Sequence, residues 1–176
     1  VAWLDLQEYR GEWTYYLVEF SSLAVGGDEL DFSASTLGGT IGAAIIDSGT
    51  TEIILPSSVL GSTSDSGTVL GDLYSGYTGS MSNEELKAWL NQDYALSESY
   101  MTGFPTVSIT LDSKHILNLT ISEMTLCVDD GDTFCQSGIS SGSMTITGNI
   151  AIAGKVDCPI KLAVPPSNDC TMHLCF

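Results

Sequence analysis

The sequence predicts an all-β domain with one or two short helices. Several segments alternate between apolar and polar residues, as half-buried strands do, and the clearest are residues 104–111 and 115–121. Only one segment combines a helix start signal with helical spacing of its apolar residues. The chain has 23 serines and 17 threonines among its 176 residues, whereas charged residues make up only 15%. Hydroxyl groups therefore carry much of the surface polarity, which favours a secreted, β-rich protein.

The charge of the chain excludes a nucleic-acid partner. Five Lys and Arg residues stand against 22 Asp and Glu residues, so the formal net charge is −17 at pH 7, and a phosphate backbone would be repelled. No run of 18 apolar residues occurs, so no membrane span is expected. The chain starts at Val1 rather than at a methionine, and we therefore expect a processed form or a fragment of a longer precursor.

Strand signals open the domain. Residues 13–20 are rich in aromatic and β-branched side chains, which predicts a strand. Residues 22–25 continue this pattern, and the Gly26-Gly27 pair followed by Asp-Glu-Leu predicts a hairpin turn. Two or three strands are therefore expected here.

An acid follows the next strand signal. Residues 41–46 form a continuous apolar run that is too short for a buried helix, so we expect a strand covered on both faces. Turn-forming residues interrupt the run at 47–50, and an extended apolar pattern then resumes until Pro56. Asp47 is therefore expected at a tight loop between two buried strands.

The middle of the chain holds the helix signal. Residues 61–80 are dense in Gly and Ser and predict a surface excursion. Ser82 and Glu85 have the spacing of a capping box, and three apolar residues at helical spacing follow, so we expect a helix over residues 83–94. Beyond it, the two alternating segments predict a hairpin that turns around residues 112–114.

Five cysteines lie in the last third of the chain, and an odd number in a secreted protein leaves one free or paired with another chain. Cys127 and Cys135 flank a loop with an Asp-Gly turn signal, so we expect a disulfide between them. The pairing of Cys158, Cys170 and Cys175 stays open. A zinc site is not expected, because a structural site needs four ligands in two close pairs and only one cluster exists, at Cys170, His173 and Cys175.

The surroundings of Asp47 suggest chemistry. A carboxylate beside apolar strands is costly unless it is hydrogen-bonded, and the residues that follow it offer backbone amides and hydroxyls. Activation of a water molecule requires a second carboxylate that shares one proton with the first. The sequence shows no second acid in a loop of this kind between apolar strands.

Residues 44–51, Ala-Ile-Ile-Asp-Ser-Gly-Thr-Thr, with Ile-Ile-Leu-Pro at 53–56, resemble the second active-site loop of pepsin-like aspartic peptidases. Four further segments, in the same order along the chain, resemble that family's C-terminal lobe: residues 13–20, 23–27, 104–111 and 146–148. The resemblance implies a pepsin-like single lobe over residues 1–165, followed by a Cys-containing tail over residues 166–176.

The resemblance also implies roles for individual residues. Asp47 would be one of two catalytic aspartates, and Ser48, Gly49 and Thr50 would form the active-site loop, with Thr50 hydrogen-bonded across the lobe junction. Thr51 would lie close to bound substrate. The implied mechanism is general acid-base hydrolysis of a peptide bond by a water held between two carboxylates, without a covalent intermediate, a metal or a cofactor.

The implied partners are a peptide substrate and an N-terminal pepsin-like lobe from the same precursor or a separate chain. A secreted or extracellular location is expected, or else a vacuolar or lysosomal lumen. The alternative function is a non-catalytic lobe that serves as a structural or binding module in an extracellular or cell-surface assembly. A homodimer in which each copy gives one Asp is a weaker third option. Self-association is expected through the face around Asp47, Thr50 and Ile146 when no other lobe covers it.

Three further features bear on function. Glu52 adds an acid in a stretch that the family keeps apolar or neutral, and the segment after Gly148 departs from the family's usual lobe ending. A Ser-His-Asp triad is disfavoured, because His115 lies in an alternating strand segment and His173 in the tail. Asn118 and Thr120 form an N-glycosylation sequon, so an N-glycan is expected at Asn118 if the chain passes through the secretory pathway.

Overall fold

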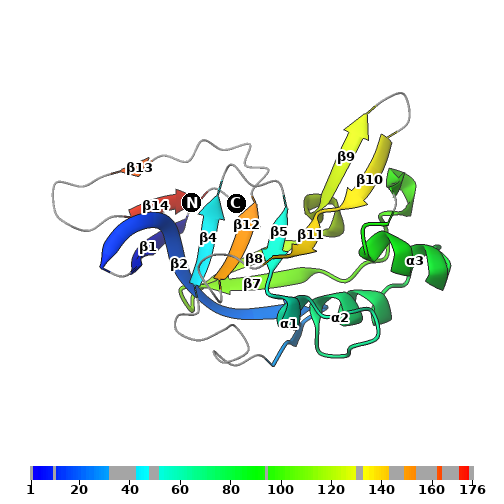
Figure 1. Ribbon diagram of the computed structural model, residues 1–176, viewed down its shortest axis with the longest axis horizontal. Helices are drawn as coiled ribbons and strands as arrows, with labels where there is room; N and C mark the ends of the chain where they lie inside the picture. The colour runs from blue at the N-terminus through cyan, green and yellow to red at the C-terminus, as the bar shows by residue number, and fades with distance from the viewer. Residues whose placement is uncertain are drawn as a thin grey trace.

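The computed structural model describes residues 2–9, 11–31, 43–47, 52–93, 95–129, 133–142, 149–153, 162–163 and 171–174. Most of the elements in these residues are strands, as predicted (Figure 1). The strands are β1 (Ala2–Tyr9), β2 (Glu12–Val25), β3 (Asp28–Glu29), β4 (Ala43–Asp47), β5 (Ile53–Leu55), β6 (Leu96–Ser97), β7 (Val107–Leu111), β8 (His115–Leu119), β9 (Thr125–Asp129), β10 (Thr133–Ser137), β11 (Ile139–Ser141), β12 (Asn149–Ala153), β13 (Leu162–Ala163) and β14 (Thr171–Leu174).

Two sheets account for these strands. The larger one runs in the order β11-β5-β12-β4-β2-β1-β14-β13, and β3 and β7 also pair with β2, while β8 pairs with β7. The smaller sheet has the order β6-β10-β9. Within the described residues, no helix is long and apolar enough to cross a membrane.

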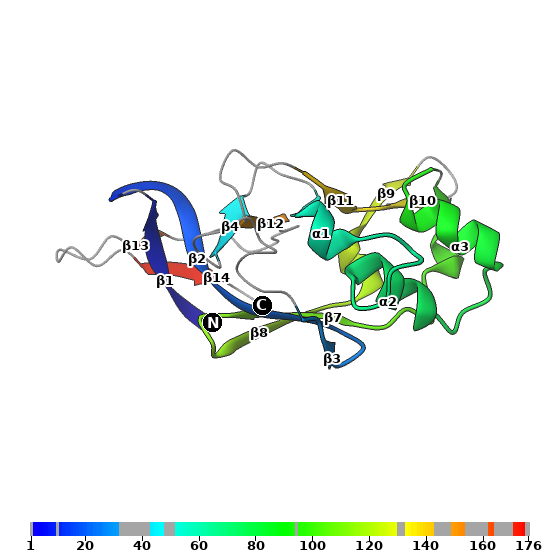
Figure 2. The ribbon, with the colours of Figure 1, turned by 60° about the horizontal axis from the view of Figure 1, so that its bottom comes forward.

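The long strand β2 connects two parts of the larger sheet. Its first half pairs with β1 and β4, and its second half pairs with β3 and β7. The register with β7 shifts between Phe20 and Ser22, which is where a bulge bends a strand. Figure 2 shows β2 curving through the molecule. The predicted hairpin is confirmed at its end, where Gly26 and Gly27 adopt φ angles of 64° and 94°.

Three short α-helices, α1 (Ser57–Leu60), α2 (Val69–Ser75) and α3 (Asn83–Leu90), and two 3₁₀ turns, η1 (Glu98–Tyr100) and η2 (Ile121–Met124), accompany the sheets in the described residues. The prediction for residues 61–80 was wrong in part, because α2 lies inside that segment and buries Val69, Leu70 and Leu73. The Gly- and Ser-rich residues on both sides of α2 lower the average hydrophobicity of the segment, so its few apolar residues do not stand out in the sequence. Thr68 caps the helix by accepting a hydrogen bond from the Gly71 N–H.

The predicted start of α3 is confirmed and its predicted end is not. The capping box between Ser82 and Glu85 is present in both directions. The helix stops at Leu90 instead of residue 94, because Gln92 takes a φ of 63° and ends the helical run. The Asp93 N–H then returns a hydrogen bond to the Ala88 carbonyl over 2.9 Å, as in a left-handed helix cap.

Both later hairpins are confirmed. Strands β7 and β8 pair from Val107↔Leu119 to Leu111↔His115, and η2 follows β8 where the prediction extended the strand to residue 121. Strands β9 and β10 place Cys127 directly opposite Cys135, with 4.1 Å between their Cα atoms, and the predicted disulfide joins them. Cys158, Cys170 and Cys175 lie outside the described residues.

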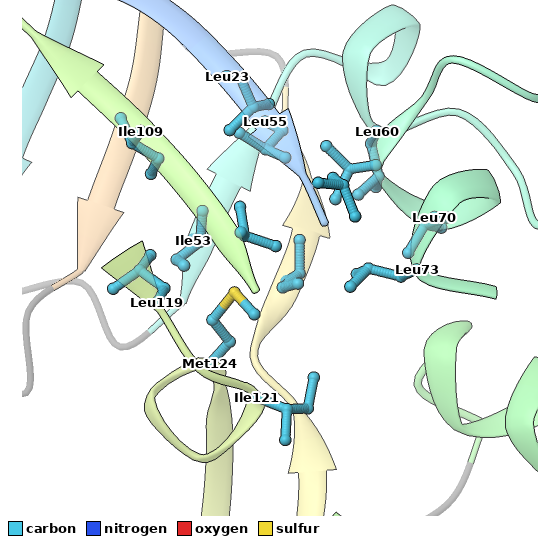
Figure 3. Close-up of a cluster of buried hydrophobic side chains, with 14 of the residues drawn as sticks. Leu23, Ile53, Leu55, Leu60, Leu70, Leu73, Ile109, Leu119, Ile121 and Met124 are labelled. Atoms are coloured by element: carbon cyan, nitrogen blue, oxygen red, sulfur yellow. The ribbon is translucent and has the colours of Figure 1, made fainter. Parts of the chain in front are cut away.

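The hydrophobic core lies between the larger sheet and the helices. Figure 3 shows apolar side chains from the strands and from the helices packed in one cluster. The cluster there includes Leu23, Ile53, Leu55, Leu60, Leu70, Leu73, Ile109, Leu119, Ile121 and Met124, all of them buried. These residues come from β2, β5, β7, β8, α1, α2 and η2, so the core ties the sheet that carries Asp47 to the helical side of the molecule.

Candidate active site

Asp47 is the last residue of a buried central strand. Strand β4 pairs antiparallel with β2 through Leu17↔Ile45 and parallel with β12, whose register ends at Ala153↔Asp47. Ala44, Ile45 and Ile46 are buried at consecutive positions, which confirms the prediction of a strand covered on both faces. Asp47 is thus the first acidic position after a run of apolar residues, at the end of the sheet where β4 and β12 both terminate.

Strand β12 separates the two strands that flank the predicted loop. It pairs parallel with β4 on one side and contacts β5 on the other, through Ala151↔Ile54 in antiparallel register. The chain therefore leaves the sheet at Asp47 and re-enters it at Ile53 on the far side of β12 (Figure 1). Asp47 itself pairs with Ala153 of β12, so a strand about 100 residues further along the chain fixes its backbone position.

The other predicted loop residues, Ser48, Gly49, Thr50 and Thr51, lie outside the described residues. The same holds for residues 146–148. The structure thus gives the backbone position of Asp47 in β4, and the roles of the four residues after it remain predictions.

Glu52, the acid that follows the predicted active-site loop, is half-buried and hydrogen-bonded. Its Oε2 accepts a hydrogen bond of 2.6 Å from the Ser140 hydroxyl on β11. Next to it, the Ile53 N–H donates to the Gly138 carbonyl over 2.7 Å, and β5 then pairs parallel with β11. Glu52 is therefore anchored to a neighbouring strand at the first described residue after Asp47.

The tetrapeptide Asp-Ser-Gly-Thr occurs a second time, at residues 65–68, and here its role is structural. Asp65 accepts hydrogen bonds from the N–H and hydroxyl of Ser62, over 3.0 and 2.8 Å. The Thr68 hydroxyl donates to the Asp65 carbonyl over 2.6 Å and caps α2. Asp65 is exposed on a turn. The signal that separates the two occurrences is the apolar strand on each side of Asp47, which Asp65 lacks.

Asn118 lies on the exposed side of β8, as its alternation predicts. Its Oδ1 accepts a hydrogen bond of 2.8 Å from the Ser108 hydroxyl on β7. Ile116 on the same side is also exposed, as is Thr120 beyond the strand.

In the described part of the chain, no three His, Cys, Asp or Glu side chains gather as a metal site would require.

The comparisons with known proteins agree with this arrangement. The sequence model of the family described as eukaryotic aspartyl protease matches residues 1–156, a span that contains Asp47 and every strand that holds it. A search of curated proteins found no match. A family match over most of the chain, together with a mostly β fold that places Asp47 at the end of a buried central strand, shows that this chain belongs to the eukaryotic aspartyl protease family.

Proposed function

We propose that the chain is the C-terminal half of an aspartic endopeptidase and that Asp47 is one of its two catalytic carboxylates. The observation that carries this proposal is the placement of Asp47 at the end of β4, where the chain crosses to the far side of β12. The family match over residues 1–156 supports it. Peptides are the substrate class that this family membership favours.

The chemistry requires a second carboxylate from another lobe. One aspartate, charged, takes a proton from a water molecule held between the two groups, and the protonated partner polarises the scissile carbonyl. The resulting tetrahedral intermediate breaks down when the amide nitrogen receives a proton and leaves. In this proposal the active-site loop consists of Ser48, Gly49 and Thr50, and its hydrogen-bond donors stabilise the ionised form of Asp47. Thr51 contacts the peptide.

The buried run before Asp47 suits this task. Ala44, Ile45 and Ile46 leave the carboxylate no polar side chain on its own strand, so its charge depends on donors from the following loop and on the partner carboxylate. Two carboxylates that share a proton in such surroundings have separated pKa values, which is the condition for one to act as base while the other acts as acid.

A non-catalytic role in an assembly is the second candidate. With Cys127 bonded to Cys135, three cysteines remain, so at least one of them has no partner within the chain. An unpaired cysteine in an oxidising compartment is available for a bond to another chain. In this role the face that a second lobe covers in the peptidase would bind another copy or another protein.

The disulfide also supports the proposed location. Disulfides persist in oxidising compartments and are rare in the cytosol, so the Cys127–Cys135 bond favours a secreted protein or one in a vacuolar or lysosomal lumen.

The test is Asp47→Asn in the complete protein that includes the second lobe, with proteolysis measured at acid pH. We expect activity to fall by about 10²–10⁴-fold or more, because an amide cannot share the catalytic proton. Asp65→Asn is the matched control, since it changes the same tetrapeptide where Asp65 only supports a turn, and we expect it to retain activity. Full activity of Asp47→Asn would overturn the assignment, and inactivity of the unsubstituted complete protein would favour the assembly role.

A further inference from the structure

Strand β8 forms an edge of the larger sheet within the described residues. It pairs with β7 and with no other described strand, and Figure 2 shows the two strands side by side along the bottom of the view. An edge strand presents unpaired backbone N–H and C=O groups, which can recruit a strand from another molecule. Lys, Pro and bulges are common protections against this, and residues 115–119, His-Ile-Leu-Asn-Leu, contain neither Lys nor Pro.

The outer side of β8, meaning the face of the sheet on which its side chains are exposed, carries an apolar residue and an amide. Leu119 is buried and Leu117 half-buried on the inner side, whereas Ile116 is 61% exposed and Asn118 is exposed on the outer side. Ile116 has the largest exposed fraction among the exposed large apolar residues of the described chain. An exposed isoleucine on a free edge is a site where strands of different molecules would associate.

The rest of this outer side is lined by hydroxyl groups. Ser22 on β2 donates a hydrogen bond to Thr110 on β7 over 3.0 Å, and Thr110 lies opposite Ile116. Ser108 donates to Asn118 Oδ1 over 2.8 Å, directly across from it. This contact holds the Asn118 oxygen, and within the described residues its Nδ2 has no hydrogen-bond acceptor. The side chain is thus oriented with its nitrogen available for substitution.

We propose that Asn118 carries an N-linked oligosaccharide and that this glycan covers Ile116 and shields the edge of β8 that no described strand pairs with. The sequon Asn118-Leu119-Thr120 is the only Asn-x-Ser/Thr sequence in the chain, and both its Asn and its Thr are exposed. The fold therefore accommodates a bulky polar group at this position without displacing a buried side chain.

The modification uses a lipid-linked pyrophosphate oligosaccharide as donor. A bond forms between Asn118 Nδ2 and the anomeric carbon of the first sugar, while the bond between that carbon and the pyrophosphate oxygen breaks. The amide nitrogen loses one proton, the lipid pyrophosphate leaves with the electron pair, and nothing is oxidised or reduced. The proposal requires passage through the secretory pathway and is independent of whether Asp47 is catalytic.

The first measurement is intact mass and peptide mapping of the complete protein secreted from a eukaryotic host, before and after amidase deglycosylation. We expect a hexose- and N-acetylhexosamine-containing mass on the Asn118 peptide, lost after treatment. Asn118→Gln should abolish it, whereas Asn91→Gln and Thr120→Ser should retain it, because Asn91 lies outside the sequon and serine preserves it. Unmodified Asn118 in the secreted protein would overturn the proposal.

The second measurement tests the shielding role by light scattering and size-exclusion chromatography. Enzymatic deglycosylation of the folded protein avoids any effect of substitution on folding, and we expect the monomer fraction to fall at least about twofold at equal concentration. Ile116→Ser should restore the monomer in deglycosylated material, because it removes the exposed apolar side chain. Equal monomer fractions with and without the glycan would refute the shielding role.

Discussion

The Ser140 hydroxyl donates a hydrogen bond of 2.6 Å to Glu52 Oε2, joining β11 to the residue that follows the predicted active-site loop. The two residues are 88 positions apart in sequence, and both are half-buried. The contact fixes the point at which the chain returns from that loop to the sheet.

Removing this donor is expected to weaken the fold where the loop ends. Ser140→Ala should lower the free energy of unfolding by about 1 kcal/mol, because the carboxylate loses a partner that water only partly replaces. Glu52→Gln should cost less, since the amide oxygen still accepts the bond. Urea denaturation of the variants measures both effects.

Ser141→Ala is the matched control for Ser140→Ala. Ser141 is the next residue on β11, is exposed and has no hydrogen bond from its side chain within the described residues. Its substitution should change the free energy of unfolding by less than about 0.5 kcal/mol. If Ser140→Ala and Ser141→Ala were equally mild, the Glu52 contact would contribute nothing to stability.

A second prediction concerns the buried indole of Trp89. Its Nε1–H donates to the Cys135 carbonyl over 2.9 Å, and the side chain is 0% exposed. Trp89→Phe removes the donor and leaves unfilled volume, so we expect a loss of about 2–3 kcal/mol in the free energy of unfolding. Tyr100→Phe, at an exposed aromatic residue, should shift the same measurement by less than about 0.5 kcal/mol. Comparable values for the two variants would contradict this account.

Local signals in the sequence correctly predict the elements that depend on neighbouring residues. The capping box of Ser82 and Glu85 starts α3 because both of its hydrogen bonds lie within one turn. Cys127 and Cys135 meet because a hairpin with a short connection has only a few registers. The unbroken apolar run before Asp47 likewise implies burial on both faces of one strand, which the structure shows.

Features set by distant residues are the ones that the sequence leaves open. The position of β12 between β4 and β5 depends on pairing across about 100 residues, and no local pattern at residues 149–153 reveals it. Strand β1 is not predicted, although it forms a large part of the sheet next to β2. The hydrogen bond between Glu52 and Ser140 likewise has no local signal. The two Asp-Ser-Gly-Thr sequences show the same limit, because four residues do not define an environment.

The capping box makes the stability of α3 depend on pH. Hydrogen bonds from the Ser82 hydroxyl and then from the Ser82 N–H lower the pKa of Glu85 below its ordinary value of 4.5. A lowered pKa in the folded state means that the ionised carboxylate stabilises the fold above pH 4.5, and that this contribution is lost as the pH falls through the folded-state pKa.

The test compares wild type with Glu85→Gln between pH 6 and pH 2.5 by thermal unfolding. The stability advantage of the wild type should be greatest above pH 4.5 and shrink as the pH falls, because only its residue 85 is ionised. Glu84→Gln is the matched control, since Glu84 is the neighbouring exposed acid without a bond to Ser82 within the described residues, and its difference from wild type should depend less on pH. A constant difference for Glu85→Gln would contradict the assignment.

The last prediction concerns the disulfide of the β9–β10 hairpin. Cys127 and Cys135 are eight positions apart, and closing a loop of that length restricts the unfolded chain by an amount equivalent to about 2–3 kcal/mol. The double variant Cys127→Ala/Cys135→Ala should lose roughly this much stability in urea denaturation without reductant. With a reductant, wild type and double variant should approach each other, because the bond is then absent from both. Measuring the double variant with and without reductant isolates any contribution from Cys158, Cys170 and Cys175. Equal stability of wild type and double variant under oxidising conditions would show that the bond does not stabilise the folded hairpin.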